Sequence, residues 1–230
     1  MEIITHPSPN CNERRHGGDP DMVVLHYTAM QTAEDALARL CCPEHEVSAH
    51  YLISETGQVW QMVDENLRAW HAGAGAWGEI TDVNSHSIGI ELANPGDRPF
   101  PEAQMVALEE LLGGVLRRWD IAPERVIAHS DMAPDRKFDP GPKFDWRRLA
   151  LGGLSVWPSS SGGEDRDLDR RFQKAAHCIG YRGALTDVDR AFRARFGADS
   201  ADGPIGLQQV AFAEYLALHF PAADVTSVAS

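Results

Sequence analysis

The sequence has little that suits a membrane-spanning or polyanion-binding protein. No apolar run approaches the roughly 18 residues that cross a bilayer, and the first ten residues lack the basic and apolar segments of a signal peptide. The 21 lysines and arginines face 34 acidic residues, for a formal net charge of -13, so charge alone attracts neither nucleic acid nor anionic lipid. We predict no nucleic-acid partner, no membrane span and a cytoplasmic location, with a periplasmic or envelope-associated location as the alternative.

Cysteine is also scarce. The four cysteines include no CxxC spacing, and the adjacent pair Cys41 and Cys42 has poor geometry for a mutual disulfide. We therefore predict reduced thiols, which agrees with a cytoplasmic location.

The chain is long enough for one domain of about 150 residues and a second, smaller one. After Leu149 the composition shifts to glycine, serine and proline, which is typical of a linker. Three helical patterns follow, at 167–178, at 186–196 with Thr186 and Asp189 as its cap, and at 204–219. We predict a catalytic domain at 1–155, a linker at 156–166 and a helical domain at 167–230.

Within the first 155 residues, apolar runs alternate with helical patterns. The segment 74–87 is rich in small residues, and we expect it to be irregular, with Trp77 and Asn84 available to line a cleft. Gly113 and Gly114 weaken the middle of the longer helix. Strands are predicted at 22–27, 48–54, 58–63, 87–92 and 125–128, with a hairpin turn at 55–57, and helices at 32–40 and 101–119.

The stretch 126–146 passes from a short strand into a polar loop that contains His129 and several prolines. Such a stiff loop can aim side chains at one point with little loss of entropy. His129 and a loop aspartate would give zinc an imidazole and a carboxylate, and spacing alone leaves three aspartates open. A catalytic zinc takes three protein ligands and leaves the fourth position to water. His26, at the end of strand 22–27, is the candidate third ligand, although a histidine at a strand end is commonly structural. The three candidate aspartates are Asp131, Asp135 and Asp139.

Two further charged residues stand out. Glu91 lies in the apolar strand 87–92, where a carboxylate without a partner is costly, so it has either a function or a buried arginine partner. Lys137 lies in the histidine-containing loop, where it serves the same site or is a solvated charge.

Five segments together resemble the zinc-dependent N-acetylmuramoyl-L-alanine amidases of the AmpD and AmiD type. They occur in the family's order and cover roughly residues 20–150. The segments are LHYTAM, SAHYLISETGQVWQMV, RAWHAG, NSHSIGIELANPG and AHSDMAPDRKFDPGPKFDW.

The resemblance implies that zinc is held by His26, His129 and Asp139, with Glu91 as general base and Lys137 as oxyanion stabiliser. It implies an α/β fold, in which a central mixed β-sheet is flanked by helices and followed by a small three-helix C-terminal domain. That domain resembles the peptidoglycan-binding domain of the AmiD branch. The implied reaction is hydrolysis of the amide between N-acetylmuramic acid, including its 1,6-anhydro form, and L-alanine in peptidoglycan fragments during bacterial cell-wall recycling.

The implied partners are muropeptides or peptidoglycan, and four residues near the motifs are predicted to contact sugar or peptide: Trp70, His71, Asn84 and Asn94. Core packing is the alternative for the two tryptophans Trp70 and Trp77. The competing functions are a peptidoglycan-recognition module that does not cut, and an envelope amidase that acts on polymeric wall. Because the aromatic residues of 167–230 fall at helical spacings that suit a core, we expect this part to contribute more to stability than to turnover of small muropeptides.

Overall fold

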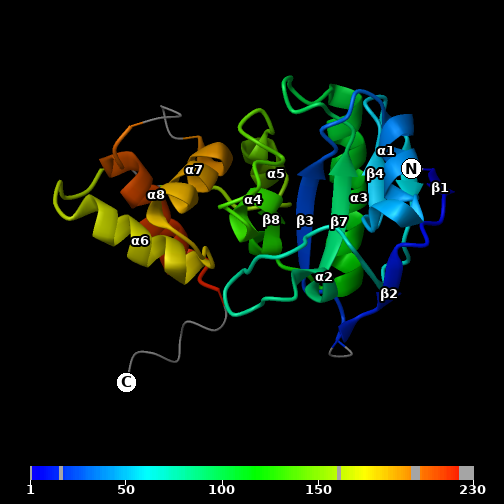
Figure 1. Ribbon diagram of the computed structural model, residues 1–230. Coiled ribbons are helices and arrows are strands. Elements are labelled where there is room, and N and C mark those ends of the chain that lie inside the picture. The colour runs from blue at the N-terminus through cyan, green and yellow to red at the C-terminus, as the bar shows by residue number, and fades with distance from the viewer. Residues whose placement is uncertain (1, 16–17, 160–161, 198–202, 223–230) are drawn as a thin grey trace.

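The computed structural model describes residues 2–15, 18–159, 162–197 and 203–222, which are built around a six-stranded mixed sheet (Figure 1). Its strand order is β1-β5-β4-β7-β3-β8; β4 and β5 pair antiparallel, and the other neighbours pair in parallel. A separate two-stranded sheet pairs β2 with β6. The strands are β1 (Ile3–Thr5), β2 (Cys11–Glu13), β3 (Met22–Tyr27), β4 (Tyr51–Ile53), β5 (Val59–Gln61), β6 (Leu67–Ala69), β7 (Ser87–Leu92) and β8 (Val126–Ala128). The predicted α/β fold with a central mixed sheet is confirmed.

Strands β3 and β7 lie inside the sheet because their sequences are apolar enough to be buried on both faces. Val23, Leu25 and Ile90 pack with the helix α3 (Glu102–Trp119) on one face. The register places His26 opposite Glu91, and partners in a parallel pair share a face. Both side chains therefore lie on the face opposite α3.

The predicted helices of the first half are present. Helix α1 (Ala33–Leu40) begins after Thr32, whose hydroxyl accepts the Asp35 N–H at 3.1 Å. Helix α3 runs through Gly113 and Gly114 without a break, because leucines and valines on both sides of them are buried. Among the helices of the described residues, none has the length and apolarity to cross a bilayer.

Several short elements were not predicted, because three to six residues carry no usable periodicity. They are β1, β2, β6, α2 (Val83–His86), α4 (His129–Met132), α5 (Trp146–Leu151) and the 3-10 helices η2 (Pro43–His45) and η3 (Pro123–Arg125). The expectation that Trp77 lines a cleft is wrong. Its side chain is buried and meets the Tyr181 ring edge-on, at 5.0 Å between centroids.

Three helices follow, as predicted, and Figure 1 shows them beside the β8 edge of the sheet. They are α6 (Leu168–Ile179), α7 (Leu185–Phe196) and α8 (Leu207–His219). The predicted cap of α7 is wrong: the helix begins after Ala184, so Thr186 lies inside it, and Asp189 pairs with Arg193 at 2.9 Å.

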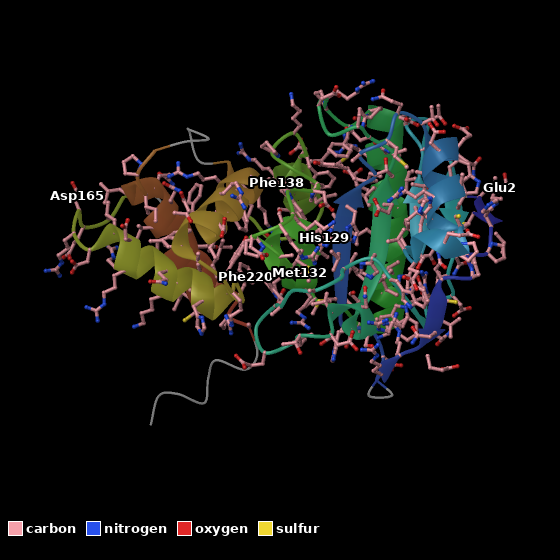
Figure 2. The ribbon with its side chains drawn as sticks, viewed as in Figure 1. Glu2, His129, Met132, Phe138, Asp165 and Phe220 are labelled. Atoms are coloured by element: carbon pink, nitrogen blue, oxygen red, sulfur yellow. The ribbon has the colours of Figure 1, made fainter. Side chains whose placement is uncertain are left out.

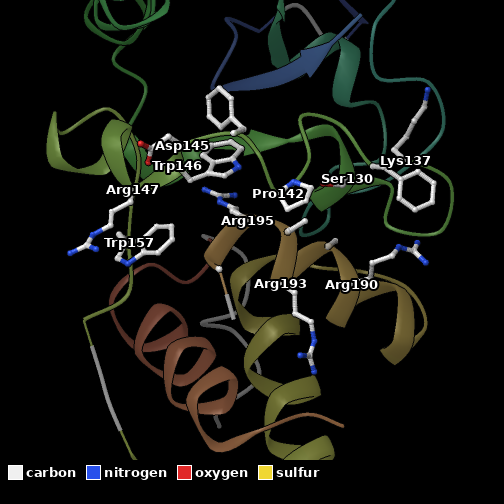
Figure 3. A pocket seen from close by; sticks show the side chains of 15 residues that line it. Ser130, Lys137, Pro142, Asp145, Trp146, Arg147, Trp157, Arg190, Arg193 and Arg195 are labelled. Carbon is white, nitrogen blue, oxygen red and sulfur yellow. The ribbon is translucent and has the colours of Figure 1, made fainter. Parts of the chain in front are cut away.

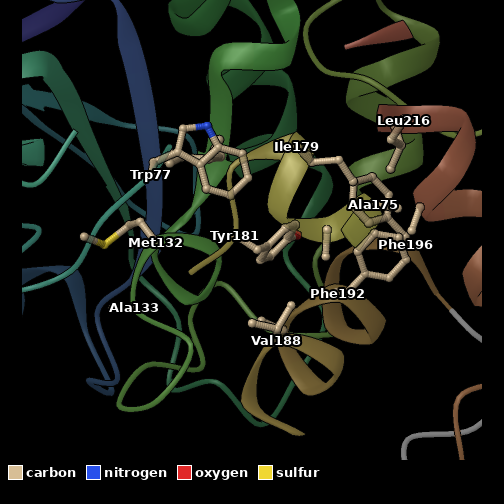
Figure 4. Packing of buried hydrophobic residues seen from close by; sticks show 14 of the residues in the cluster. Trp77, Met132, Ala133, Ala175, Ile179, Tyr181, Val188, Phe192, Phe196 and Leu216 are labelled. Atoms are coloured by element: carbon tan, nitrogen blue, oxygen red, sulfur yellow. The ribbon is translucent and has the colours of Figure 1, made fainter. Parts of the chain in front are cut away.

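One hydrophobic cluster joins these helices to the sheet (Figure 4). Met22 and Val24 of β3 and Ile127 of β8 belong to the same buried cluster as Phe172 and Phe192. The aromatic residues of the helical part thus serve packing, as their spacing predicted. The division into domains at 155 and 167 stays a prediction, and the joint cluster crosses it.

A buried polar contact also crosses this boundary. The Asp131 carboxylate is fully buried, and it accepts the Ala128 N–H at 2.8 Å, the Tyr181 hydroxyl at 2.7 Å and an N–H of Arg195. Arg195 also donates to the Val126 carbonyl at 2.8 Å, and its guanidinium lies 4.5 Å from the centre of the Trp146 ring. The C-terminal helices therefore neutralise a carboxylate buried beside β8.

Arg195→Met tests this contact. It would leave the Asp131 carboxylate buried without its cation, which costs about 3–5 kcal/mol of unfolding free energy. The matched control is Arg171→Met, which breaks the more exposed pair with Glu214 (2.8 Å) and should cost no more than about 1 kcal/mol. Urea denaturation measures both variants. Equal losses would contradict the assignment of Arg195 as the essential counter-ion.

Candidate metal centre and catalytic cleft

His26, His129 and Asp139 come together at the carboxyl ends of the central strands. Figure 2 labels His129 in its place between the sheet and the C-terminal helices. His26 lies near the carboxyl end of β3, and His129 directly follows β8. Because β3 and β8 are parallel neighbours, their carboxyl ends lie side by side. The His26 and His129 Nδ1 atoms are 2.9 Å apart, and each lies 3.0 Å from Asp139 Oδ2. All three residues are buried. Three donor atoms therefore surround one point.

The choice among the loop aspartates follows from local contacts. The Ser130 N–H donates to the Asp139 carbonyl at 3.0 Å, which folds the loop back and brings Asp139 beside His129. Asp131 is held by Tyr181 and Arg195, and Asp135 is exposed. Both therefore lie outside the donor cluster, although their spacing had left them open as ligands.

Acceptors on the far side of each imidazole orient the two histidines. His129 Nε2 lies 2.8 Å from the Ala72 carbonyl, and His26 Nε2 lies 3.0 Å from His71 Nδ1. We assign a proton to each Nε2 from these acceptors, which leaves the Nδ1 lone pairs facing the common point. A ring fixed in this way by a second partner is the usual arrangement of a metal-ligating histidine.

His71 continues this chain into the protein. Its Nε2 lies 3.2 Å from the Ser87 hydroxyl, which donates to the Val83 carbonyl at 2.6 Å. Gly89 provides the space, because a Cβ there would lie 2.4 Å from the His71 ring. His71 lines the cleft, yet both of its nitrogens have protein partners. It orients His26, and its predicted contact with substrate stays a prediction.

The charge state of the cluster suits a divalent cation. Burial, followed by the neighbouring His129, lowers the pKa of His26 to about 4. Burial raises the pKa of Asp139, but the adjoining His129 and His26 imidazoles outweigh this and hold it far below its usual range. At neutral pH His26 is thus a neutral imidazole and Asp139 a carboxylate. A divalent cation would bring the group to a net charge of about +1, as in catalytic zinc sites.

Glu91 faces the same cleft, and its carboxylate has no partner in the described part of the chain. Burial, followed by the charge of Asp139, raises the pKa of its carboxyl to about 8, and Lys137 opposes the shift. Oε2 is buried and has no hydrogen-bond partner among the described residues. The alternative prediction, a buried arginine paired with Glu91, is therefore wrong for the described residues.

The cleft has a volume of about 360 Å³, and its lining includes the donor cluster, Glu91 and three more of the predicted site residues: Trp70, His71 and Lys137. Lys137, half-buried two residues before Asp139, makes no ion pair with a described carboxylate. Trp70 is also half-buried, and its Nε1–H donates to the Asn12 side chain at 2.8 Å. Lysine and indole are thus both available to a bound molecule.

Asn84 and Asn94 are not among the residues that line the cleft. Asn84 Oδ1 accepts the backbone N–H groups of His71 at 3.0 Å and Ala72 at 2.8 Å, so it shapes the segment that orients both histidine ligands. Asn94 Oδ1 accepts the Gly96 N–H at 2.7 Å and holds a turn. Their predicted substrate contacts stay predictions.

Comparison with known proteins gives the family. The family model described as N-acetylmuramoyl-L-alanine amidase matches residues 16–142. N-acetylmuramoyl-L-alanine amidase AmiD of Escherichia coli K12 is 37% identical over 198 residues, which span 77% of this chain and 66% of AmiD. The 1,6-anhydro-N-acetylmuramyl-L-alanine amidase AmpD of Haemophilus influenzae is 33% identical over 61% of this chain and 86% of its own length.

Solved structures agree. E. coli AmiD in complex with anhydro-N-acetylmuramic acid-L-Ala-D-gamma-Glu-L-Lys superposes with a TM-score of 0.79 and 31% identity, over 91% of this chain and 94% of the AmiD chain in that structure. AmpDh3 of Pseudomonas aeruginosa in complex with anhydromuramic pentapeptide gives a TM-score of 0.75 and 29% identity, over 90% and 94%. The chain therefore belongs to the N-acetylmuramoyl-L-alanine amidase family, a family of amide hydrolases, as its motifs predicted.

Proposed function

We propose that this chain binds Zn²⁺ through His26, His129 and Asp139, and that it hydrolyses the amide between N-acetylmuramic acid and L-alanine in muropeptides. The observation that carries the proposal is the unpartnered Glu91 carboxylate, which opens onto the same cleft as the donor cluster. A structural zinc site would be closed by a fourth protein ligand, whereas the group found among the described residues has three.

The residues divide the chemistry between them. Zinc held by the three donors would supply a Lewis acid that acidifies water and polarises the scissile carbonyl. Glu91, whose pKa burial raises, is suited to accept a proton from the attacking water and to deliver it to the leaving nitrogen of L-alanine. The cation's charge would bring that pKa back toward neutrality. The Lys137 ammonium is suited to stabilise the oxyanion of the tetrahedral intermediate.

The proposed substrates are soluble muropeptides, including 1,6-anhydro forms, in cell-wall recycling. The names of the AmpD relatives and the ligands in the AmiD and AmpDh3 complexes support this choice. The cytoplasmic location stays a prediction, because membership of the family does not fix the compartment. Cell fractionation would test it.

The direct test is incubation of the zinc-loaded protein with anhydro-N-acetylmuramic acid-L-Ala-γ-D-Glu-L-Lys, followed by mass spectrometry. We expect free anhydro-N-acetylmuramic acid and the tripeptide, with the new amine on L-alanine. Tight binding without cleavage at any pH from 6 to 9 would instead identify a recognition module that does not cut.

Asp139→Asn should abolish tight zinc binding, because a neutral amide replaces the only anionic donor of the three-residue group. The matched control is Asp135→Asn, an exposed aspartate on the same loop that should bind one zinc per chain. Dialysis against zinc followed by elemental analysis measures both. Full zinc occupancy in Asp139→Asn would remove Asp139 from the ligand set.

Glu91→Gln should keep its zinc but lose about 10²–10⁴-fold in kcat, the usual contribution of a general base.

A second readout for Glu91→Gln, the pH dependence of its Tm, needs no catalysis. In metal-free protein the pKa of Glu91 in the folded state lies above its value in the unfolded state. The contribution of Glu91 to the free energy of unfolding therefore falls as pH rises from about 4.5 to about 8. The Tm of Glu91→Gln minus the Tm of wild type should therefore be larger at pH 8 than at pH 5. A pH-independent difference in Tm would argue against the raised pKa, and near-normal turnover would exclude the base.

Lys137→Met should lower kcat by about 10²–10³-fold with a small change in KM, because an oxyanion contact strengthens in the transition state. Lys143→Met is the control, since it removes an exposed lysine from the same loop and leaves the cleft intact. Steady-state kinetics of both variants decides the role. A change confined to KM would make Lys137 a substrate anchor.

A further inference from the structure

One arginine of α7 holds the turn that bears His129. Arg195 donates to the Val126 carbonyl at 2.8 Å and to the Asp131 carboxylate. Val126 begins β8 and Asp131 lies in α4, so the two acceptors stand on either side of His129 in the chain. In the described sheet β8 pairs with β3 alone, which leaves its outer edge open to such a contact. A single guanidinium therefore connects the strand before this metal ligand with the helix that the ligand begins.

The same guanidinium also contacts the segment that follows the loop of Asp139. Its central carbon lies 4.5 Å from the centre of the Trp146 ring, and Trp146 is the first residue of α5. Figure 3 shows Arg195 pointing from α7 toward this ring. The centre of the Phe196 ring lies 4.9 Å from the same carbon. Two aromatic rings and two acceptors thus fix the position of this planar cation.

The Asp131 carboxylate transmits the contact to the backbone around His129. It accepts the Ala128 N–H at 2.8 Å, which closes the turn in which His129 lies. Within that turn the Ser130 N–H donates to the Asp139 carbonyl at 3.0 Å. A rotation of the turn would therefore displace His129 and Asp139 together, and with them two of the three donor atoms.

The energetics of this contact favour a role in geometry over one in stability. Arg195 is 4% exposed, Asp131 is fully buried, and the Tyr181 hydroxyl donates to the second oxygen of Asp131 at 2.7 Å. A buried ion pair is commonly no more stabilising than apolar residues of the same volume, because the desolvation of both charges offsets their attraction. Charge-assisted hydrogen bonds add geometric specificity, which apolar side chains do not supply.

We propose, building on the zinc site of the proposed function, that Arg195 is a positioning residue of the metal centre. Through Asp131 it fixes the turn that aims His129, and it thereby sets the affinity of the chain for zinc. Outer partners of metal ligands contribute about 10–100-fold to metal affinity. By linkage, zinc strengthens the contact between Asp131 and Arg195 by the same factor, so the metal also secures α7 against the sheet.

The zinc affinity of Arg195→Met, measured by competition with a chromophoric chelator at neutral pH, is the direct test. We expect the Kd for zinc to rise about 10–100-fold. Tyr181→Phe keeps the ring and removes only the hydroxyl that binds Asp131, so its Kd should rise in the same direction by a smaller factor. If Arg195→Met fails to fold, as judged by circular dichroism, Tyr181→Phe carries the test.

The matched control is Leu216→Ala on α8. Leu216 is 1% exposed and belongs to the cluster that joins the helices to the sheet. Figure 4 shows it on the far side of that cluster from Met132, the last residue of α4. Leu216→Ala should lose Tm as Arg195→Met does, yet keep the zinc affinity of wild type, because the turn around His129 is intact. An equal rise of Kd in the control would overturn the positioning role, as would unchanged affinity in Arg195→Met or, if that variant does not fold, in Tyr181→Phe.

A second readout, amide hydrogen exchange followed by NMR, needs no metal. In metal-free Arg195→Met the Ser130 N–H should exchange about tenfold faster relative to the Gly89 N–H, which is held on β7 by His50 at 2.9 Å. Leu216→Ala should leave this ratio as in wild type. If wild type binds no zinc, the proposed function fails separately and the exchange ratio decides alone. Equal ratios in wild type, Arg195→Met and Tyr181→Phe would then reject the positioning role.

Discussion

The parallel pairing of β3 between β7 and β8 is the constraint on which the rest of the site depends. It brings the ends of the three strands to one edge, so that His26, Glu91 and His129 meet although they are far apart in sequence. The backbone then aims the side chains: the Ala72 carbonyl orients His129, and the Asp139 carbonyl accepts the Ser130 N–H. The site is therefore pre-organised by the sheet and its first loops, which lowers the entropy cost of metal binding.

The C-terminal helices belong to the same construction. Their aromatic side chains cover Met22 and Val24, two residues of the strand that bears His26, and Arg195 neutralises Asp131, two residues after His129. Stability and the active site are thus coupled through the segment that follows β8. A helical part that only tethered the enzyme to a wall would need neither contact.

Much of the fold was predictable from sequence because the long elements have strong patterns. Strands 22–27 and 87–92 are continuous apolar runs, and α3 has an amphipathic stripe. Three-residue strands such as β6 depend on their partners, so no local pattern reveals them. The ligand set came from motif resemblance; spacing could not separate Asp139 from Asp131. Tertiary contacts separate the two aspartates, because Tyr181 and Arg195 hydrogen-bond the Asp131 carboxylate from positions 50 and 64 residues later in the chain. A backbone acceptor such as Ala72 leaves no side-chain signal at all.

The central claim is an open, three-ligand zinc site, and anomalous diffraction at the zinc edge tests it most directly. Crystals grown with one equivalent of zinc should show a single peak about 2.0–2.2 Å from the Nδ1 atoms of His26 and His129 and from an oxygen of Asp139, with no other protein side chain in the coordination sphere. A peak elsewhere in the molecule, or a fourth protein ligand closing the site, would contradict the account.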